Sequence, residues 1–223
     1  VQNASDHLCF INKMLDEDTM WDVELDHTAK MIHAVRGLAE QEELLHMVTL
    51  DISKGYRRLL HRFVDRAQLG LSVTVDFDGE VPHFDGVTQT MMKVKKGDVL
   101  HVFDRSLPFG LRTSVSSFCA VTTVIRDAVR ELLDGSVAGR VKLLTYVDDF
   151  VLVGDPSAVH DGILILRKFL KKIGLPENEL KSQTPGPTGQ YLGVDYDFRT
   201  PSAVTATLPA DKKARYVKHL HYY

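Results

Sequence analysis

Two adjacent aspartates, Asp148 and Asp149, stand between two short apolar runs and offer the clearest chemistry in the chain. The runs 143–147 and 150–153 favour strands, so we expect a hairpin with both carboxylates at its turn. Carboxylate oxygens are ligands of hard cations, and Mg²⁺ is typically held by one or two of them together with substrate phosphates. Because Asp also favours turns, an ordinary structural hairpin explains the same pair.

A site for two metal ions needs a further carboxylate from another part of the fold. Asp51 is the natural candidate because it closes the apolar run 47–50 and would therefore lie at the end of a neighbouring strand. Asp76 and Asp78 are the rivals, and a turn at Gly79 explains both of them. The hypothesis predicts that the carboxylate of Asp51 meets those of the hairpin in one cleft.

The elements that must position these residues alternate between helical and strand patterns. Apolar residues at helical spacing predict helices over 31–39, 118–132 and 155–174, and a last helix from Pro209. β-rich runs predict strands at 47–52, 191–197 and 204–208, and a loop-rich strand region over 72–103. The predicted N-caps are Asp26 and Asp155, and the predicted helix ends are Gly135 and Gly174. These elements favour an α+β fold, an antiparallel sheet with helices packed on one face.

The composition is that of an ordinary globular protein. Of 223 residues, 44% are apolar and 26% are charged, which argues against disordered, collagen-like and coiled-coil chains. No run of 18 or more apolar residues occurs, so no membrane span is predicted. Cys9 and Cys119 are the only cysteines, too few for a disulfide framework or a thiolate metal site.

The charge is distributed unevenly along the chain. Residues 1–50 carry three basic and ten acidic side chains, a net charge of −7, whereas the remaining residues carry 24 basic and 20 acidic ones, a net charge of +4. Two basic clusters lie in this second part: Arg57, Arg58, Arg62 and Arg66, then Lys212, Lys213, Arg215 and Lys218. A polyanion could bind these clusters, and ordinary solvated faces explain them as well.

Several segments resemble the motifs of one enzyme family. Tyr146-Val147-Asp148-Asp149 is similar to the Tyr-x-Asp-Asp signature of reverse transcriptases of the retroelement type. Four further segments between 45 and 220 resemble family motifs in the right order: Leu50 to Tyr56, with an aromatic residue five positions after Asp51; Leu107-Pro108-Phe109-Gly110-Leu111; Gly174 to Ser182, which carries Lys181; and the primer-grip-like Tyr191-Leu192-Gly193. Five motifs in order make chance resemblance a poor explanation.

The resemblance implies a right-hand polymerase palm that transfers nucleotides. By this analogy Asp51, Asp148 and Asp149 hold two Mg²⁺ ions, for which Mn²⁺ could substitute, and Lys181 faces the triphosphate. The implied nucleotide-binding residues are Ile52, Tyr56, Phe109 and Gly110, and the implied primer grip is Tyr191, Leu192 and Gly193. Strand packing, turns and an exposed lysine explain the same residues without any nucleotide.

The resemblance also implies a division into three regions: 1–46, an acidic helical part of the fingers; 47–198, the palm; and 199–223, the start of a thumb or a C-terminal extension. The stretch near 72–104 is longer than the family pattern, and we interpret it as an insertion. The family's clamp of Lys and Arg residues ahead of the first acidic motif has no counterpart in residues 1–50. We therefore expect another segment or another protein chain to supply fingers or thumb.

Three classes of function remain open. The first is an intracellular RNA-directed DNA polymerase, in the nucleus, the cytoplasm or an organelle, acting on an RNA or DNA template with a primer and deoxynucleoside triphosphates. The second is a domesticated reverse-transcriptase fold that serves as a scaffold or assembly subunit. The third, a nucleotide cyclase or an RNA-templated RNA polymerase, is disfavoured by Tyr56 and the Leu-Pro-Phe-Gly run. Three intact acids favour the first class over the second, because converging like charges need a cation.

Overall fold

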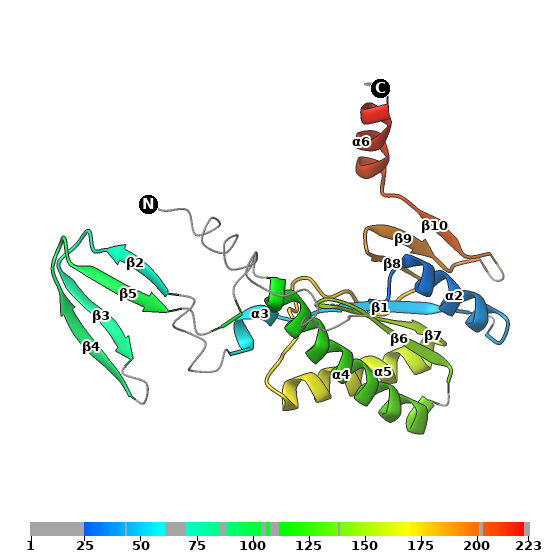
Figure 1. Ribbon diagram of the computed structural model, residues 1–223. Coiled ribbons are helices and arrows are strands. Elements are labelled where there is room, and N and C mark those ends of the chain that lie inside the picture. The colour runs from blue at the N-terminus through cyan, green and yellow to red at the C-terminus, as the bar shows by residue number, and fades with distance from the viewer. Residues whose placement is uncertain are drawn as a thin grey trace. The chain divides into compact units, whose positions relative to one another are not determined.

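A computed structural model describes residues 25–42, 44–60, 70–84, 88–103, 106–107, 112–137, 139–200 and 203–220. The chain divides into two compact units, one containing Tyr56–Ser114 and the other containing Met20–Gly55 and Val115–Tyr223. Figure 1 shows the elements of both units. Among the described residues, no helix has both the length and the apolar character that crossing a membrane would require.

The larger unit is built on a three-stranded antiparallel sheet. Its strands are β1 (His46–Asp51), β6 (Val141–Tyr146) and β7 (Asp149–Gly154), in the order β1-β7-β6. The central strand β7 is buried along residues 150–154 because both faces of the sheet are covered. The predicted hairpin is thus confirmed, and its central strand pairs on its other side with the predicted strand that ends at Asp51.

Two long helices, α4 (Arg112–Val137) and α5 (Pro156–Lys172), cover one face of this sheet (Figure 1). The carboxylate of Asp155 caps α5 as predicted, accepting hydrogen bonds from the backbone N–H groups of Ser157 and Ala158. A Cβ at Gly162 would lie 3.3 Å from side-chain carbons of Leu133 in α4 and Leu152 in β7. The small residue therefore lets two helices and the sheet pack closely at one point.

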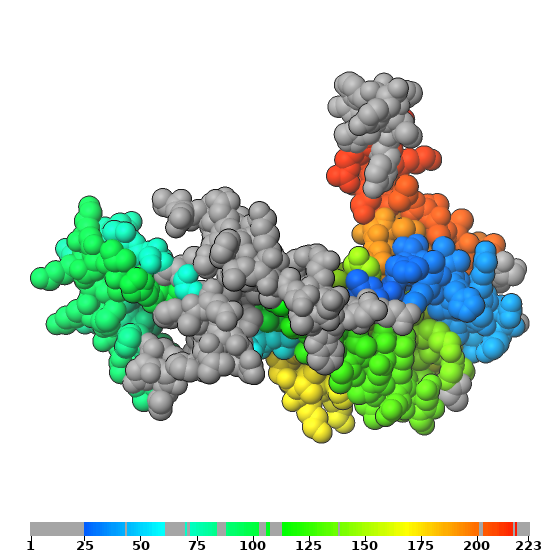
Figure 2. Space-filling view, in the orientation of Figure 1, coloured from blue at the N-terminus to red at the C-terminus, as the bar shows by residue number. Residues whose placement is uncertain are grey.

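The other face is covered by α2 (Thr28–Ala39) and by a second antiparallel sheet. This sheet contains β8 (Thr188–Tyr191), β9 (Val194–Asp197) and β10 (Thr205–Thr207), in the order β10-β9-β8. Figure 2 shows α2, in blue, packed beside the orange strands of the second sheet. The core between these layers contains Met31, Val35 and Leu38 from α2, Met47, Val151 and Val153 from the first sheet, and Tyr191, Tyr196 and Phe198. The predicted α+β class with antiparallel sheets is confirmed, but the helices are not confined to one face as predicted, because α2 packs on the face opposite α4 and α5.

Among its described residues, the smaller unit contains α3 from Tyr56 onward (Gly55–Arg58) and four strands. Strand β2 (Gly70–Thr74) pairs with β5 (Val99–Phe103), and β3 (Gly79–Phe84) pairs with β4 (Gln89–Val94). The β2–β5 pairing ends at Thr74 opposite Val99, and the β3–β4 pairing begins at Gly79 opposite Val94. Four residues lie between the two pairings on each side, so both pairings share one register. The predicted loop-rich region is therefore one antiparallel ribbon with a single interruption.

Between the two pairings of this ribbon, aspartate side chains accept hydrogen bonds from backbone N–H groups. The carboxylate of Asp78 accepts a hydrogen bond from the backbone N–H of Lys96 at 2.8 Å, and that of Asp98 accepts one from Lys95 at 2.8 Å. Asp78 therefore serves a turn, as the structural alternative predicted. Of the first basic cluster, Arg57 donates a hydrogen bond to the Ser106 hydroxyl at 3.1 Å, while Arg62 and Arg66 lie outside the described residues.

Three predicted element boundaries are wrong. Helix α2 is capped by His27, whose Nδ1 accepts a hydrogen bond from Ala29, because the Asp26 side chain is turned into the protein interior. Helix α4 continues through Gly135, since a helical glycine costs only about 1 kcal/mol and Val137 beyond it is buried. The predicted strand 191–197 is split by a turn into β8 and β9. The expected last helix is α6 (Ala210–Leu220).

Candidate metal centre

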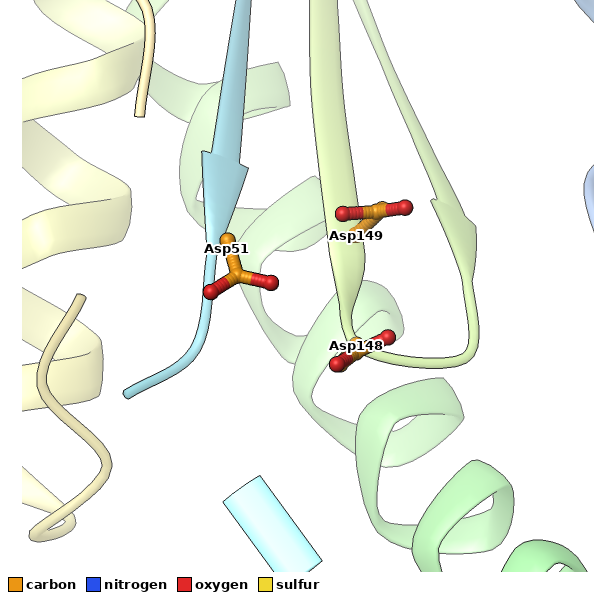
Figure 3. Close-up of side chains that lie close together, drawn as sticks. All are labelled: Asp51, Asp148 and Asp149. Carbon is orange, nitrogen blue, oxygen red and sulfur yellow. The ribbon is translucent and has the colours of Figure 1, made fainter. Parts of the chain in front are cut away.

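Three carboxylates converge where β1 ends and β7 begins. Asp51 is the last residue of β1, and it lies opposite Asp149, the first residue of β7. Asp148 occupies the turn just before Asp149. One carboxylate oxygen from each of the three residues lies within 4.8 Å of the others, and Figure 3 shows the group at the strand ends. The structure thus brings together the three acids that the sequence pattern selected.

The turn between β6 and β7 explains how two adjacent acids reach one site. Because Tyr146 pairs with Asp149, only Val147 and Asp148 remain in the loop. Val147 has a φ of 55°, in the left-handed region that a β-branched residue rarely adopts. Such strain costs of order 1–3 kcal/mol and persists only where the surrounding structure fixes it. Here the fixed turn holds Asp148 beside the strand end that carries Asp51.

The electrostatics of the cluster favour a bound cation. Burial raises the pKa of Asp149 to about 6, and the charges of Asp148 and Asp51 add to that rise. Burial likewise raises the pKa of Asp148, with a further contribution from Asp51. Half-buried carboxylates that repel one another are stabilised by a divalent ion, and oxygen-only donors suit Mg²⁺ or Mn²⁺. The residues present therefore fit the metal that the hypothesis requires.

Lys181 is held beside the carboxylates by the segment that follows α5. The N–H of Asn178 donates to the Asp51 carbonyl at 2.7 Å, and the N–H of Gln183 donates to the Thr49 carbonyl at 3.0 Å. This pairing along β1 places the Lys181 Nζ 3.6 Å from Oδ2 of Asp51. The lysine side chain is 67% exposed, so its ammonium group is accessible to an anionic ligand at the cluster.

A cavity of about 240 Å³ connects the carboxylates to the turn of the second sheet. Its lining includes Asp51, Asp149 and Lys181 together with Tyr191, Leu192 and Gly193. Leu192 and Gly193 have φ values of 50° and 70°, as a tight two-residue hairpin turn requires. A side chain at residue 193 would collide with Nζ of Lys212, which donates a hydrogen bond to the Gly193 carbonyl at 3.4 Å. The turn thus approaches α6 closely because residue 193 is a glycine.

The structure describes only two of the four implied nucleotide-binding residues. The Ile52 side chain is buried, and its backbone N–H donates to the Asp148 carbonyl at 3.4 Å, so any contact of Ile52 with a ligand would use its backbone. Tyr56 lies in α3, in the smaller unit. Phe109 and Gly110 lie outside the described residues. The roles of these four residues therefore stay predictions.

Sequence patterns missed two kinds of residue, one in the cavity and one that supports the strand leading to Asp148. Gln183 and Gln190 line the cavity and bind each other: the Gln190 N–H donates to Oε1 of Gln183, and Nε2 of Gln183 donates to the Gln190 carbonyl, both at 3.3 Å. Asp26, predicted to be a helix cap, instead accepts hydrogen bonds from Arg126 and Arg130 of α4. The spacing of these arginines, four residues apart on one helix, was the available signal.

A family model matches most of the chain. The family model described as reverse transcriptase (RNA-dependent DNA polymerase) matches residues 9–196, which include all three clustered acids and the Leu192–Gly193 turn. A comparison with curated proteins found no significant match. Because the family model covers most of the sequence, the chain belongs to the reverse transcriptase family.

Proposed function

We propose that the chain catalyses RNA-directed DNA synthesis by transferring deoxynucleotides to a primer. The observation that carries this proposal is the convergence of Asp51, Asp148 and Asp149 within 4.8 Å, in a chain of the reverse transcriptase family. In the proposed reaction, the primer 3′ oxygen forms a bond to the α-phosphorus, and the bond from that phosphorus to the β-phosphate oxygen breaks. Pyrophosphate leaves, and the hydroxyl proton passes to solvent or to a nearby base.

The three carboxylates would hold two Mg²⁺ ions, with Mn²⁺ as a possible substitute. Such ions, when bound, lower the pKa of the primer hydroxyl and neutralise the charge of the leaving group. Asp51 and Asp149 would orient the ions from two adjacent strands, while Asp148 would act from the turn. Lys181 would balance the triphosphate charge, a role supported by its exposed ammonium group beside Asp51.

The 240 Å³ cavity is the proposed position of the primer end. It lies between the carboxylates and the Leu192–Gly193 turn, so a sugar held against that turn would face the site of transfer. Ile52, Tyr56, Phe109 and Gly110 are proposed to contact the incoming nucleotide, with Tyr56 excluding a 2′-hydroxyl by its size. The template would be RNA or DNA.

A cationic clamp for the triphosphate is proposed to come from another segment or from a partner chain. Residues 1–50 carry a net charge of −7, which makes them a poor electrostatic surface for a nucleoside triphosphate. The same feature would suit a domesticated scaffold, the second candidate. The intact carboxylate cluster favours the enzyme, because a scaffold gains nothing from repelling acids.

Primer extension tests the proposal. The chain is supplied with a primed RNA template, deoxynucleotides and Mg²⁺ or Mn²⁺, first alone and then with its native partner. We expect extension in at least one arrangement, and we expect Asp148→Asn to abolish it, because the amide is a poor cation ligand of nearly the same shape. Asp161→Asn, an exposed position on α5, is the matched control and should extend normally. A folded chain that never extends a primer, yet binds a protein partner independently of Asp148, would support the scaffold instead.

A further inference from the structure

We propose that Tyr191 and Asp26 form a positioning brace, which fixes the Leu192–Gly193 turn against the strand that leads to Asp148. The brace would set the distance between the primer end and the carboxylates. This inference rests on the proposed function, since it concerns how that same site holds its primer.

Tyr191 supplies the first half of the brace. Its side chain belongs to the core between the two sheets, and the residue is only 2% exposed. The hydroxyl donates a 2.6 Å hydrogen bond to the backbone carbonyl of Asp26. A buried hydroxyl already engaged in this way cannot serve as a direct primer contact. Tyr191 is one of the residues that line the cavity, but its hydroxyl would act through Leu192, the next residue, rather than by touching the primer.

Asp26 supplies the second half by pairing with β6. Its N–H donates to the Thr145 carbonyl, and its Oδ2 accepts from the Thr145 N–H, both at 3.0 Å. Thr145 lies three residues before Asp148, and only Tyr146 and Val147 separate them. Both ends of the brace thus attach immediately next to the groups that must meet: the turn at 192–193 and the acid at 148.

Cations from two helices hold Asp26 in place. Its carboxylate lies 3.3 Å from the Arg126 guanidinium, 3.5 Å from that of Arg130 and 3.1 Å from the Lys30 ammonium. Arg130 also donates to the Leu143 carbonyl of β6, at 2.7 and 3.0 Å. Asp26 is 2% exposed, so this charge is satisfied entirely by neighbours whose positions are fixed by α2, α4 and β6.

The hydrogen bonds of the brace fix the position of the turn more narrowly than apolar packing does. The core between the sheets is held by the hydrophobic effect, which has no preferred direction. A hydrogen bond fixes a distance and an angle. The Tyr191 bond therefore restricts how far the β8–β9 turn can shift along β6, and hence how far a primer end can move from the carboxylates.

The test removes one hydroxyl. Tyr191→Phe should raise the KM for primer–template about five-fold, and it should lower extension from a matched 3′ end more than from a mismatched one, because the matched end depends on accurate placement. The KM for deoxynucleotide and the Mn²⁺ affinity should stay unchanged. The matched control is Tyr196→Phe in the neighbouring strand β9, where a buried hydroxyl has no hydrogen-bond partner among the described residues. This variant should behave like the wild type.

The outcomes separate the brace from the proposed function. If the wild type extends primers and Tyr191→Phe matches it in KM and in mismatch discrimination, the brace is wrong and the function stands. If the wild type extends no primer in any arrangement, the proposed function fails. The brace is then judged by fluorescence anisotropy of a labelled primer–template, where equal affinity of wild type and Tyr191→Phe would overturn it.

Discussion

At the scale of single residues, the site depends on three carboxylates that are kept close, half-buried and short of counter-charge. Among the described residues, Lys181 is the cation paired with the cluster; it lies 3.6 Å from Asp51 and is largely exposed, so water weakens its effect. The pKa of Asp149 is raised to about 6 because burial and repulsion by the other two acids outweigh the attraction of Lys181. A cation removes the imbalance because it replaces repulsion by attraction for all three acids.

The first prediction concerns pH and metal binding. Mn²⁺ affinity should rise steeply from pH 5 to pH 7, because Asp149 must lose its proton to act as a ligand. Without metal, the free energy of unfolding should fall as pH rises from about 4 to about 6, since the folded state then binds more protons than the unfolded one. Titration calorimetry and melting in chelator measure the two effects. Asp149→Asn should flatten both profiles, and a pH-independent affinity in the wild type would contradict the assignment.

At the scale of elements, the site is assembled from strand ends and tight turns. The β6–β7 turn carries Asp148, and Asp149, the next residue, lines the same cavity as the β8–β9 turn. Helix α6 contacts the β8–β9 turn through Lys212, whose ammonium group donates a hydrogen bond to the Gly193 carbonyl. Elements far apart along the chain thus meet at one cavity, each through a few residues.

The second prediction tests α6 as part of the primer surface. Lys212→Ala should weaken primer–template binding and reduce the salt dependence of log affinity by about 0.9, the loss expected for one phosphate contact. Lys213→Ala, at the next residue, which is exposed, is the matched control and should have a smaller effect. Fluorescence anisotropy over a series of salt concentrations measures both. If log affinity depended equally on salt concentration in the two variants, Lys212 would not be part of the primer surface at the turn.

The third prediction concerns the buried charges that join α2, α4 and β6. Asp26→Asn should lower the free energy of unfolding by about 3 kcal/mol, because it leaves the buried Arg126 without its main interior counter-charge. Asp127→Asn removes the other acid bound to Arg126, but that acid is 56% exposed, so the loss should stay within about 1 kcal/mol. Urea unfolding compares the two. A larger effect at Asp127 would contradict the burial argument.

At the scale of the whole molecule, local and long-range features differ in how far the sequence predicts them. Asp51, Asp148 and Asp149 were found because strand ends and turns leave local patterns of apolar residues. The role of Asp26 could not be predicted in this way, because its partner Arg126 lies 100 residues away and only the tertiary fold brings the two side chains together. Gly135 was misread as a helix end for a related reason, since the packing of α4 outweighs a local preference. The α+β class followed from the order of patterns along the chain.

The last prediction uses the division into two units. All three acids of the cluster lie in the larger unit, whereas the ribbon of β2 to β5 lies in the smaller one. Replacing residues 79–94 by an Asn-Gly turn should keep the pairing of β2 with β5, because both halves of the ribbon share one register. Mn²⁺ affinity should then remain within about two-fold of the wild type, as expected for a site with no ligand in the ribbon. Calorimetry measures it, with circular dichroism to check folding. A folded shortened chain that no longer binds Mn²⁺ would mean that the ribbon takes part in the metal site, and that the smaller unit is more than an insertion.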